Sequence, residues 1–339
     1  MNYKSILITG GTGSFGQNYV RWLVKNKSKE LKRLVVFSRD EMKQYEMSQQ
    51  FNQKKYSFIR YFLGDVRDYK RLKMATKGIE TIIHAAALKQ VPASEYNPFE
   101  TIKTNIVGAQ NVIEAALESN VSKVIALSTD KAAAPINLYG ATKLCADKLF
   151  VAANNVFQSK LNKKIFTVVR YGNVVGSRGS VIPFFLNLNR NSIYPITHKS
   201  MTRFSIKMSE AIDMINWVYK NAKGGEIFVP KIPSYRILDL LKAINPTAKY
   251  KIVGIRQGEK LHEQMITEND GFNTIDLGKY YAILQSENQK NNYLVNKKVK
   301  KVPQNFSYSS SKNICMSIKE IKHVIQDYLK NKNEQNNSL

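Results

Sequence analysis

The chain has 339 residues, 43% of them hydrophobic and 23% charged, so it can bury a large core in one domain or in two closely joined ones. Its 52 lysines and arginines outnumber its 26 aspartates and glutamates, which gives a formal net charge of +26. Because the basic residues are scattered and no recognition-helix, RNP-like or zinc-finger pattern occurs, we expect no nucleic-acid partner and attribute the charge to compositional bias and attraction for an anionic substrate.

The two cysteines, Cys145 and Cys315, stand in unrelated contexts. This argues against a disulfide framework or a cysteine-rich metal site and favours a reducing compartment. We expect Cys145 to be a small packed side chain on a helix. No apolar run is long enough to cross a bilayer, and the first predicted strand begins too early to leave room for a signal peptide. We therefore expect a cytoplasmic protein with no membrane span and no metal.

The first predicted element is a strand, Ser5 to Thr9, which runs directly into a glycine-rich turn and then a helix with apolar residues at helical spacing. In such a turn, missing side chains let backbone N–H groups approach a pyrophosphate at the positive end of the helix. The strand before and the helix after make this a strong dinucleotide signature. The cofactor contacts predicted here are Gly10, Thr12, Gly13, Ser14, Phe15 and Gly16.

The second predicted strand, residues 34–37, ends in Ser38, Arg39 and Asp40, with Lys43 close behind. At this position an acidic residue holds a ribose hydroxyl, whereas a basic residue accommodates a 2′-phosphate. Arg39 and Lys43 therefore favour NADP, while Asp40 leaves NAD open as the second choice. Ser38, Arg39 and Lys43 are the predicted contacts.

Two further strands, residues 61–63 and 81–87, end in an acidic turn and in a run of alanines. Asp65 can meet the adenine amino group, and the alanines can let a nicotinamide approach the backbone, although turn chemistry and tight packing explain these residues equally well. We expect His84 to be a structural histidine, because no second histidine or cysteine stands near it. The predicted cofactor contacts in this part of the chain are Asp65, Val66, Ala85, Ala86, Ala87, Lys89 and, on a helix over 98–117, Asn105.

Strands over 124–127 and 166–170 follow, separated by a helix over 139–149. Strands that alternate with helices at this spacing predict an α/β fold with a Rossmann-type, doubly wound parallel sheet. We assign residues 1–170 to this NADP-binding domain, with a returning strand near 225–232. Ligands of such sheets bind outside the carboxyl ends of the strands, where every candidate named so far lies.

After residue 170 the chain becomes glycine-rich and basic up to residue 183, which is typical of a binding loop. We assign residues 171–285 mainly to a smaller α/β substrate-binding region with a helix over 209–219. Arg178, Arg203 and Arg256 are expected to converge on a diphosphate, since arginine suits multidentate phosphate recognition; the alternative is three unrelated surface arginines. The predicted substrate contacts are Lys89, Tyr171, Asn173, Arg178, Ser180, Val181, Thr202, Arg203, Arg256 and Glu259.

Residues 286–339 are rich in lysine and asparagine, and we assign them to a C-terminal extension with one helix over 317–329 and a frayed tail over 330–339.

The chemistry is expected at residues 129–143. Tyr139 and Lys143 share one face of a helix, so Tyr139 can act as base at a sugar O4 while Lys143 favours its phenolate and contacts the ribose. Thr129 is expected to fix the reacting oxygen. Asp130 and Lys131 exceed what hydride transfer needs and indicate a second proton transfer, with Asp130 as acid at O6 and Lys131 as base at C5. As a base Lys131 must be neutral, which burial near other cations can achieve; alternatively the two residues cap the next helix or pair with each other.

The motifs Gly10-x-x-Gly13-x-x-Gly16, Thr129-Asp130-Lys131 and Tyr139-x-x-x-Lys143 resemble the extended short-chain dehydrogenases/reductases. Within them, residues 128–135, 176–183 and 256–263 resemble the UDP-N-acetylglucosamine 4,6-dehydratases of the C5-inverting type that opens pseudaminic acid synthesis. The familiar dTDP-glucose dehydratases carry Glu where this chain has Lys131. Relatives commonly carry Asn where this chain has Ala134.

The resemblance implies a tightly bound, recycled NADP that takes hydride from C4 of UDP-N-acetylglucosamine and returns it to C6. Water is lost between C5 and C6, and C5 is reprotonated on the opposite face. It also implies a homo-oligomer, a hexamer or a dimer. The alternatives are a non-inverting dehydratase or C4 epimerase of a related UDP-sugar, or a cofactor-binding regulator without chemistry.

Overall fold

The structure, a computed structural model, describes residues 3–156 and 164–337. Its centre is one large sheet made of β1 (Ser5–Thr9), β2 (Arg33–Ser38), β3 (Ile59–Leu63), β4 (Thr81–His84), β5 (Lys123–Thr129), β6 (Ile165–Tyr171), β10 (Ile227–Pro230), β14 (Thr274–Asp276), β15 (Tyr280–Ile283) and β16 (Lys300–Lys301). The strand order is β16-β14-β15-β10-β6-β5-β4-β1-β2-β3. The strands from β10 to β3 run parallel, and β14, β15 and β16 pair antiparallel at the other edge.

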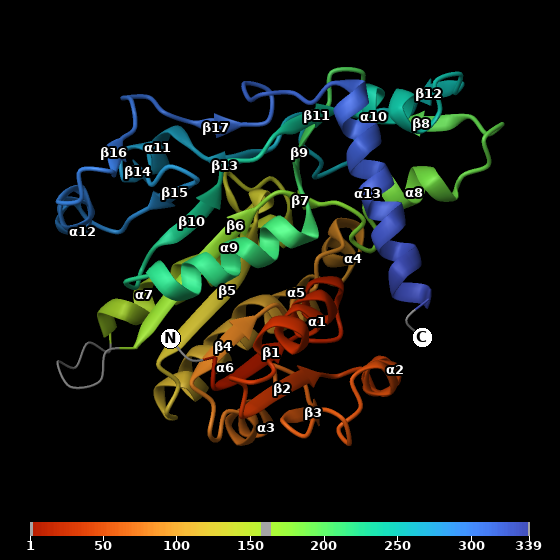
Figure 1. Cartoon of the computed structure of the whole chain (residues 1–339). Coiled ribbons are helices and arrows are strands. Elements are labelled where there is room, and N and C mark those ends of the chain that lie inside the picture. Colours follow the sequence, from red (N-terminus) through yellow and green to blue (C-terminus); the bar gives the residue numbers. More distant parts are fainter. Residues whose placement is uncertain (1–2, 157–163, 338–339) are drawn as a thin grey trace.

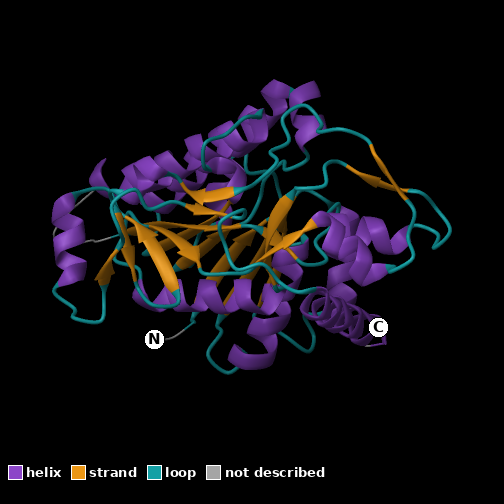
Figure 2. Cartoon of the chain, turned by 90° about the horizontal axis from the view of Figure 1, so that it is seen from above, coloured by secondary structure: helices purple, strands orange, loops and turns teal. Residues whose placement is uncertain are grey.

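The parallel strands are apolar along their length because both faces of the sheet are covered. Every residue of β1 is buried, and helices lie on both sides of the sheet (Figure 2). These helices are α1 (Ser14–Lys27), α2 (Glu41–Gln50), α3 (Tyr69–Ala75), α4 (Val91–Tyr96), α5 (Pro98–Ile102), α6 (Gly108–Leu117), α7 (Leu138–Val156) and α9 (Met208–Asn221). The order β3-β2-β1-β4-β5-β6 is that of a Rossmann sheet, so the predicted fold class is confirmed.

The helix predicted over 98–117 is one continuous rod in which a π-helical turn, Lys103–Val107, joins α5 to α6. A second short turn, the 3-10 turn Asp130–Ala132, connects β5 to the segment before α7. Both irregular turns lie at the end of the sheet where the strands finish. Irregular turns of this kind re-aim side chains and are frequent at functional sites.

The second half of the chain forms smaller sheets beside the large one. They pair β7 (Asn173–Val174), β9 (Thr202–Ile206) and β11 (Ser234–Arg236), then β8 (Tyr194–Ile196) with β12 (Tyr250–Ile252), and β13 (Gln264–Ile266) with β17 (Tyr308–Ser309). The accompanying helices are α8 (Val181–Asn187), α10 (Ile237–Ile244), α11 (Glu268–Gly271), α12 (Glu287–Leu294) and α13 (Ile318–Asn337). A separate hydrophobic cluster holds α8, α10 and α13 together, and these helices lie side by side in Figure 1.

Two sequence expectations about the fold are wrong. The last helix does not fray after residue 329, since α13 continues to Asn337. Cys145 is exposed rather than packed, because it faces outward from α7. The segment after residue 286 also contributes β16 to the large sheet and β17 to a smaller one. Among the described helices, none is long and apolar enough to cross a membrane.

Candidate active site

A cleft of about 1080 Å³ opens at the carboxyl ends of the parallel strands, between the large sheet and the second half of the chain. At the end of β1, the floor of the cleft is the glycine-rich turn over residues 10–16, called the glycine turn below. Gly10 has φ +64, and a Cβ there would lie 2.8 Å from the backbone nitrogen of Ala86, so only glycine fits. The following helix, α1, starts after Gly13 with no side-chain cap and no acidic residue in its first turn. Its first N–H groups are therefore available to an anion.

The end of β2 forms the next part of the cleft wall. Asp40 caps α2 by accepting a hydrogen bond of 3.0 Å from the backbone nitrogen of Lys43, and it also forms an ion pair with the Lys43 ammonium. The Arg39 guanidinium lies 3.7 Å from Asp65. The carboxylate that would serve a ribose hydroxyl is thus already engaged, while two basic side chains line the cleft beside it.

Tyr139 and Lys143 lie on the first turns of α7, as the sequence predicts. Gly140 between them lets the helix approach the 3-10 turn, because a Cβ there would collide with the carbonyl oxygen of Lys131. Lys143 donates a hydrogen bond of 2.7 Å to the Leu127 carbonyl. Burial lowers the pKa of Lys143, and Asp147 opposes this.

Burial raises the pKa of Tyr139 to about 12, whereas Lys131 and the hydroxyl of Thr129 lower it. Lys131 therefore acts on Tyr139 in addition to the partner Lys143 that the sequence predicts. The Lys143 ammonium donates its hydrogen bond to the end of β5.

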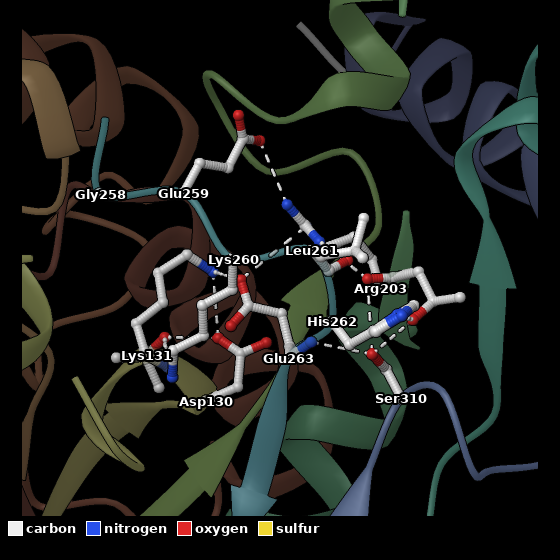
Figure 3. Close-up of polar contacts among 12 residues, drawn as sticks. Asp130, Lys131, Arg203, Gly258, Glu259, Lys260, Leu261, His262, Glu263 and Ser310 are labelled. Atoms are coloured by element: carbon white, nitrogen blue, oxygen red, sulfur yellow. Dashed lines mark hydrogen bonds and ion pairs between the residues drawn. The ribbon is translucent and has the colours of Figure 1, made fainter. Parts of the chain in front are cut away.

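The 3-10 turn places Lys131 between two buried carboxylates. Its ammonium lies 3.1 Å from Oδ1 of Asp130 and 3.0 Å from Oε1 of Glu263 (Figure 3). The exposed fraction of each carboxylate side chain is only 1%. Arg203 approaches the same Glu263 oxygen at 3.8 Å and also pairs with Glu259 at 3.1 Å.

The expectation that nearby cations would hold Lys131 neutral is wrong. Although burial lowers the pKa of Lys131, Asp130 and Glu263 outweigh it and raise that pKa above its usual value. The ammonium form is favoured because each carboxylate contacts it directly. Burial and the negative charge of Glu263 raise the pKa of Asp130, while Lys131 opposes this rise. Despite its burial, Glu263 has a lowered pKa, because Lys131 and Arg203 stabilise its charge.

The three arginines predicted to meet a diphosphate all line the cleft. Arg178 and Arg256 are exposed, whereas Arg203 is buried and neutralised by its two glutamates. Lys89 donates a hydrogen bond of 3.2 Å to the Arg178 carbonyl. This bond connects the β4 side of the cleft to the segment after β6, residues 172–183, called the glycine-rich loop below.

Most of the predicted contacts line the cleft, and three do not. Asn105 is buried. Its side-chain amide accepts a hydrogen bond from the backbone nitrogen of Leu88 and donates one to the Leu88 carbonyl, at 2.9 Å each, and it donates another to the Thr142 hydroxyl. Thr202 is buried and its hydroxyl bonds to His262 and Ser310. Asp130 is fully buried beneath Lys131. Asn105 and Thr202 therefore bond to neighbouring residues in the structure, and their contacts with a ligand stay predictions.

His84 is structural, as expected: its ring bonds to Thr9 at 2.8 Å, and burial lowers its pKa to about 3.

Sequence reasoning gave no role to Glu263, Lys260 or Asp147. Lys260 donates a hydrogen bond of 2.6 Å to the Ala133 carbonyl, next to the 3-10 turn. Asp147 joins Ser128, at 2.9 Å, to the buried Arg170, at 3.1 Å. The available signal for Glu263 was its place at the end of the motif over 256–263.

The sheet order, the glycine turn and the Tyr139–Lys143 pair together define an extended short-chain dehydrogenase/reductase. The chain belongs to the polysaccharide biosynthesis protein family, whose family model matches residues 6–285. It is 51% identical over 320 residues to a Campylobacter jejuni protein named UDP-N-acetylglucosamine 4,6-dehydratase (inverting), covering 92% of this chain and 94% of that protein. The resemblance indicated by the motifs is thereby confirmed.

Other relatives carry a different name. The chain is 40% identical over 342 residues to a Rickettsia bellii protein named UDP-glucose 4-epimerase, covering 97% of this chain and 98% of that protein. Among solved structures, it resembles Pen from Bacillus thuringiensis with a TM-score of 0.84 and 36% identity, covering 96% of this chain and 98% of that one.

Proposed function

We propose that this chain is an inverting UDP-N-acetylglucosamine 4,6-dehydratase that works with a tightly bound, recycled NADP. The observation that carries the proposal is the group formed by Lys131 and its two carboxylate partners, Asp130 and Glu263. Lys131 and Glu263 line the cleft together with Tyr139, and Asp130 is buried behind Lys131. Tyr139 and Lys143 suffice for hydride chemistry, so the additional acid–base group supports a second proton transfer such as loss of water. The name of the Campylobacter jejuni relative supports the same reaction.

The residues present fit a dinucleotide. The glycine turn has no room for side chains, and the uncapped start of α1 suits a pyrophosphate. The two basic side chains at the end of β2 support NADP over NAD. Lys43 pairs with Asp40 and Arg39 lies near Asp65, and each would exchange this partner for a 2′-phosphate. When bound, the nicotinamide would accept hydride from C4 of the sugar and later return it to C6.

The residues of the chain would then move the protons. Tyr139 would take the proton from the O4 hydroxyl, held in place by Thr129, while Lys143 contacts the ribose. Once C4 is a ketone, the C5 proton becomes acidic, and Lys131, which lines the cleft, would remove it after releasing its own proton to water there. Asp130 is covered, so its proton would reach O6 through the hydroxyl of Thr129, which contacts Oδ1 of Asp130 and would give its own proton to O6 as it takes one from Asp130.

Two exposed arginines of the cleft would hold the UDP part. Arg178 and Arg256 are exposed within the cleft and suit a diphosphate. Arg203, paired with two glutamates, would orient the sugar rather than neutralise phosphate. We further propose that the product enters pseudaminic acid synthesis and that the chain works as a homo-oligomer in the cytoplasm.

A C4 epimerase is the second candidate, since the Rickettsia bellii relative carries that name and since Tyr139 and Lys143 would serve both reactions. A non-inverting dehydratase of a related UDP-sugar is a variant of the leading proposal. The buried acid–base group favours dehydration, because epimerisation needs no proton transfer at C5.

The test is to incubate the purified protein with UDP-N-acetylglucosamine without added reductant and to analyse the product by proton NMR. The proposal predicts a 4-keto sugar with a new 6-methyl signal. A 4-epimer of the substrate without a methyl signal would overturn it in favour of the epimerase.

A further inference from the structure

Glu263 comes from a part of the chain far from the residues it contacts. It stands directly before β13, and its backbone is fixed by Ser310, which donates a hydrogen bond of 2.8 Å through its own nitrogen and accepts one of 2.9 Å through its hydroxyl. This anchoring projects the side chain toward Lys131 (Figure 3). The second half of the chain thus places a charge next to the 3-10 turn of the first half.

The hydrogen bonds around Asp130 are asymmetric. Its Oδ1 accepts bonds from the Thr129 hydroxyl, at 3.0 Å, and from Lys131, at 3.1 Å. Its Oδ2 is buried without a hydrogen-bond partner among the described residues. A carboxylate with one unpartnered oxygen is costly in a buried place, which favours the neutral acid. Oε2 of Glu263 also lacks a hydrogen-bond partner among the described residues, so the pair as a whole favours a proton, and the neighbouring cations decide which carboxyl carries it.

One ammonium, that of Lys131, is not enough to stabilise the negative charge of both carboxylates. Only one positive charge contacts Asp130, while Glu263 shares that charge and is approached by Arg203 as well. Two anions held by one buried ammonium repel each other, and the site with fewer cations protonates first. On these contacts that site is Asp130.

We propose that Glu263 is the ionised counter-charge of Lys131 and that it thereby leaves Asp130 protonated, ready to supply the proton that expulsion of water requires. Glu263 is a positioning residue in this account, since it acts through its neighbours. The inference rests on the proposed dehydration.

The charged and titratable groups around Asp130 come from several elements. Besides Lys131 and Glu263 they are Tyr139 of α7, Tyr235 of β11 and Lys260 before β13, with Arg203 of β9 behind Glu263. Burial raises the pKa of Asp130 and the negative charge of Glu263 adds to that rise, so removing this charge lowers the pKa of Asp130. Lys131 loses a stabilising neighbour at the same time, so its pKa falls too.

The first test is Glu263→Gln, which keeps the shape and removes the charge. The alkaline limb of the elimination rate, measured by NMR of the 6-methyl product, should move to lower pH by at least about one unit, because Asp130 would ionise beside Lys131. Reduction of the bound cofactor by substrate, followed at 340 nm, should persist, since Tyr139 and Lys143 are untouched. Glu287→Gln, which removes a carboxylate from a surface pair with Lys290, is the matched control.

An unchanged pH profile in active Glu263→Gln enzyme would overturn the inference. A wild-type enzyme that forms no methyl product would instead refute the proposed dehydration, so the two failures are distinguishable. Glu263→Asp, which keeps the charge on a shorter stem, should restore part of the alkaline limb.

The second test needs no activity and uses Asp130→Asn. A carboxyl whose folded pKa is raised costs stability as the pH rises above its unfolded pKa. The melting temperature of the Asn variant, relative to wild type, should therefore increase between about pH 4 and pH 7. A relative melting temperature that falls over this range would show that Asp130 is ionised and would contradict the inference.

Discussion

Tyr139 is the residue on which the hydride chemistry depends in this account. It lies on α7 facing the cleft, with Thr129 and Lys131 acting on its hydroxyl. Tyr139→Phe should lower turnover of UDP-N-acetylglucosamine at least about a hundredfold, the lower end of what a positioned acid–base group contributes. Reduction of the bound cofactor by substrate, followed at 340 nm, is the measurement. Tyr96→Phe, at an exposed position, is the control, and equal activity of the two variants would remove Tyr139 from the mechanism.

Ala134 has a left-handed backbone conformation, which asparagine adopts more readily than alanine. Its φ is +45, in the left-handed region that costs an alanine about 1–2 kcal/mol. Ala134→Asn should raise the free energy of unfolding by about 0.5–1 kcal/mol, because Asn tolerates this region.

Asn305 offers the matched control, because it has φ +61 and is exposed. Asn305→Ala should therefore lower the free energy of unfolding by a similar amount. Chemical denaturation measures both variants, and a destabilised Ala134→Asn protein would show that the backbone strain is not relieved by the side chain.

The cleft residues that could be predicted from sequence belong to motifs that lie within a short stretch of the chain. The glycine turn and the Tyr139–Lys143 spacing are defined within a few positions, so their cleft location followed from the strand and helix around them. Glu263 could not be assigned, because its partner Lys131 lies on the other half of the chain. The burial of Asn105 and Thr202 could not be predicted, because sequence does not distinguish a polar residue that bonds to its neighbours from one that binds a ligand.

At the scale of elements, α13 and the glycine-rich loop after β6 are in direct contact. Gly176 in that loop has φ +73, and a Cβ there would overlap the ring of Tyr328 on α13. Lys207, at the start of α9, holds the same helix through Asp327 at 2.6 Å. We infer that α13 supports the loop that carries the proposed substrate contacts.

Gly176→Ala should therefore raise the Michaelis constant for the UDP-sugar and lower the free energy of unfolding by about 1–3 kcal/mol, the usual cost of overpacking. Combining it with Tyr328→Ala should recover part of both losses, because the clash is removed. Gly278→Ala is the control for backbone strain alone, since Gly278 has φ +87 and nothing lies within 4 Å of its Cβ position. Purely additive effects of Gly176→Ala and Tyr328→Ala would contradict the contact.

The elements themselves were predictable where hydrophobic periodicity was strong. The parallel strands and the helices between them follow the expected order, since buried strands are continuous apolar runs. The end of α13 was not predictable, because its Lys- and Asn-rich composition is equally typical of a disordered tail. The short strands β16 and β17 gave no signal either, because two residues carry no periodicity.

At the scale of the whole molecule, the cleft is made by both halves of the chain. The large sheet supplies the glycine turn, Lys131 and Tyr139, while the second half supplies Arg203, Glu263 and the glycine-rich loop. The fold class followed from sequence, but the meeting of the two halves did not, because it depends on contacts between residues more than a hundred positions apart. The excess of positive charge fits a substrate with a diphosphate.

Turnover of UDP-N-acetylglucosamine in deuterium oxide, followed by proton NMR, decides whether this chain dehydrates its substrate with inversion. We expect a 6-methyl signal, deuterium at C5 and the L-arabino configuration of the 4-keto product. A methyl product that retains the C5 configuration of the substrate would contradict inversion, and a simple C4 epimer would contradict dehydration itself.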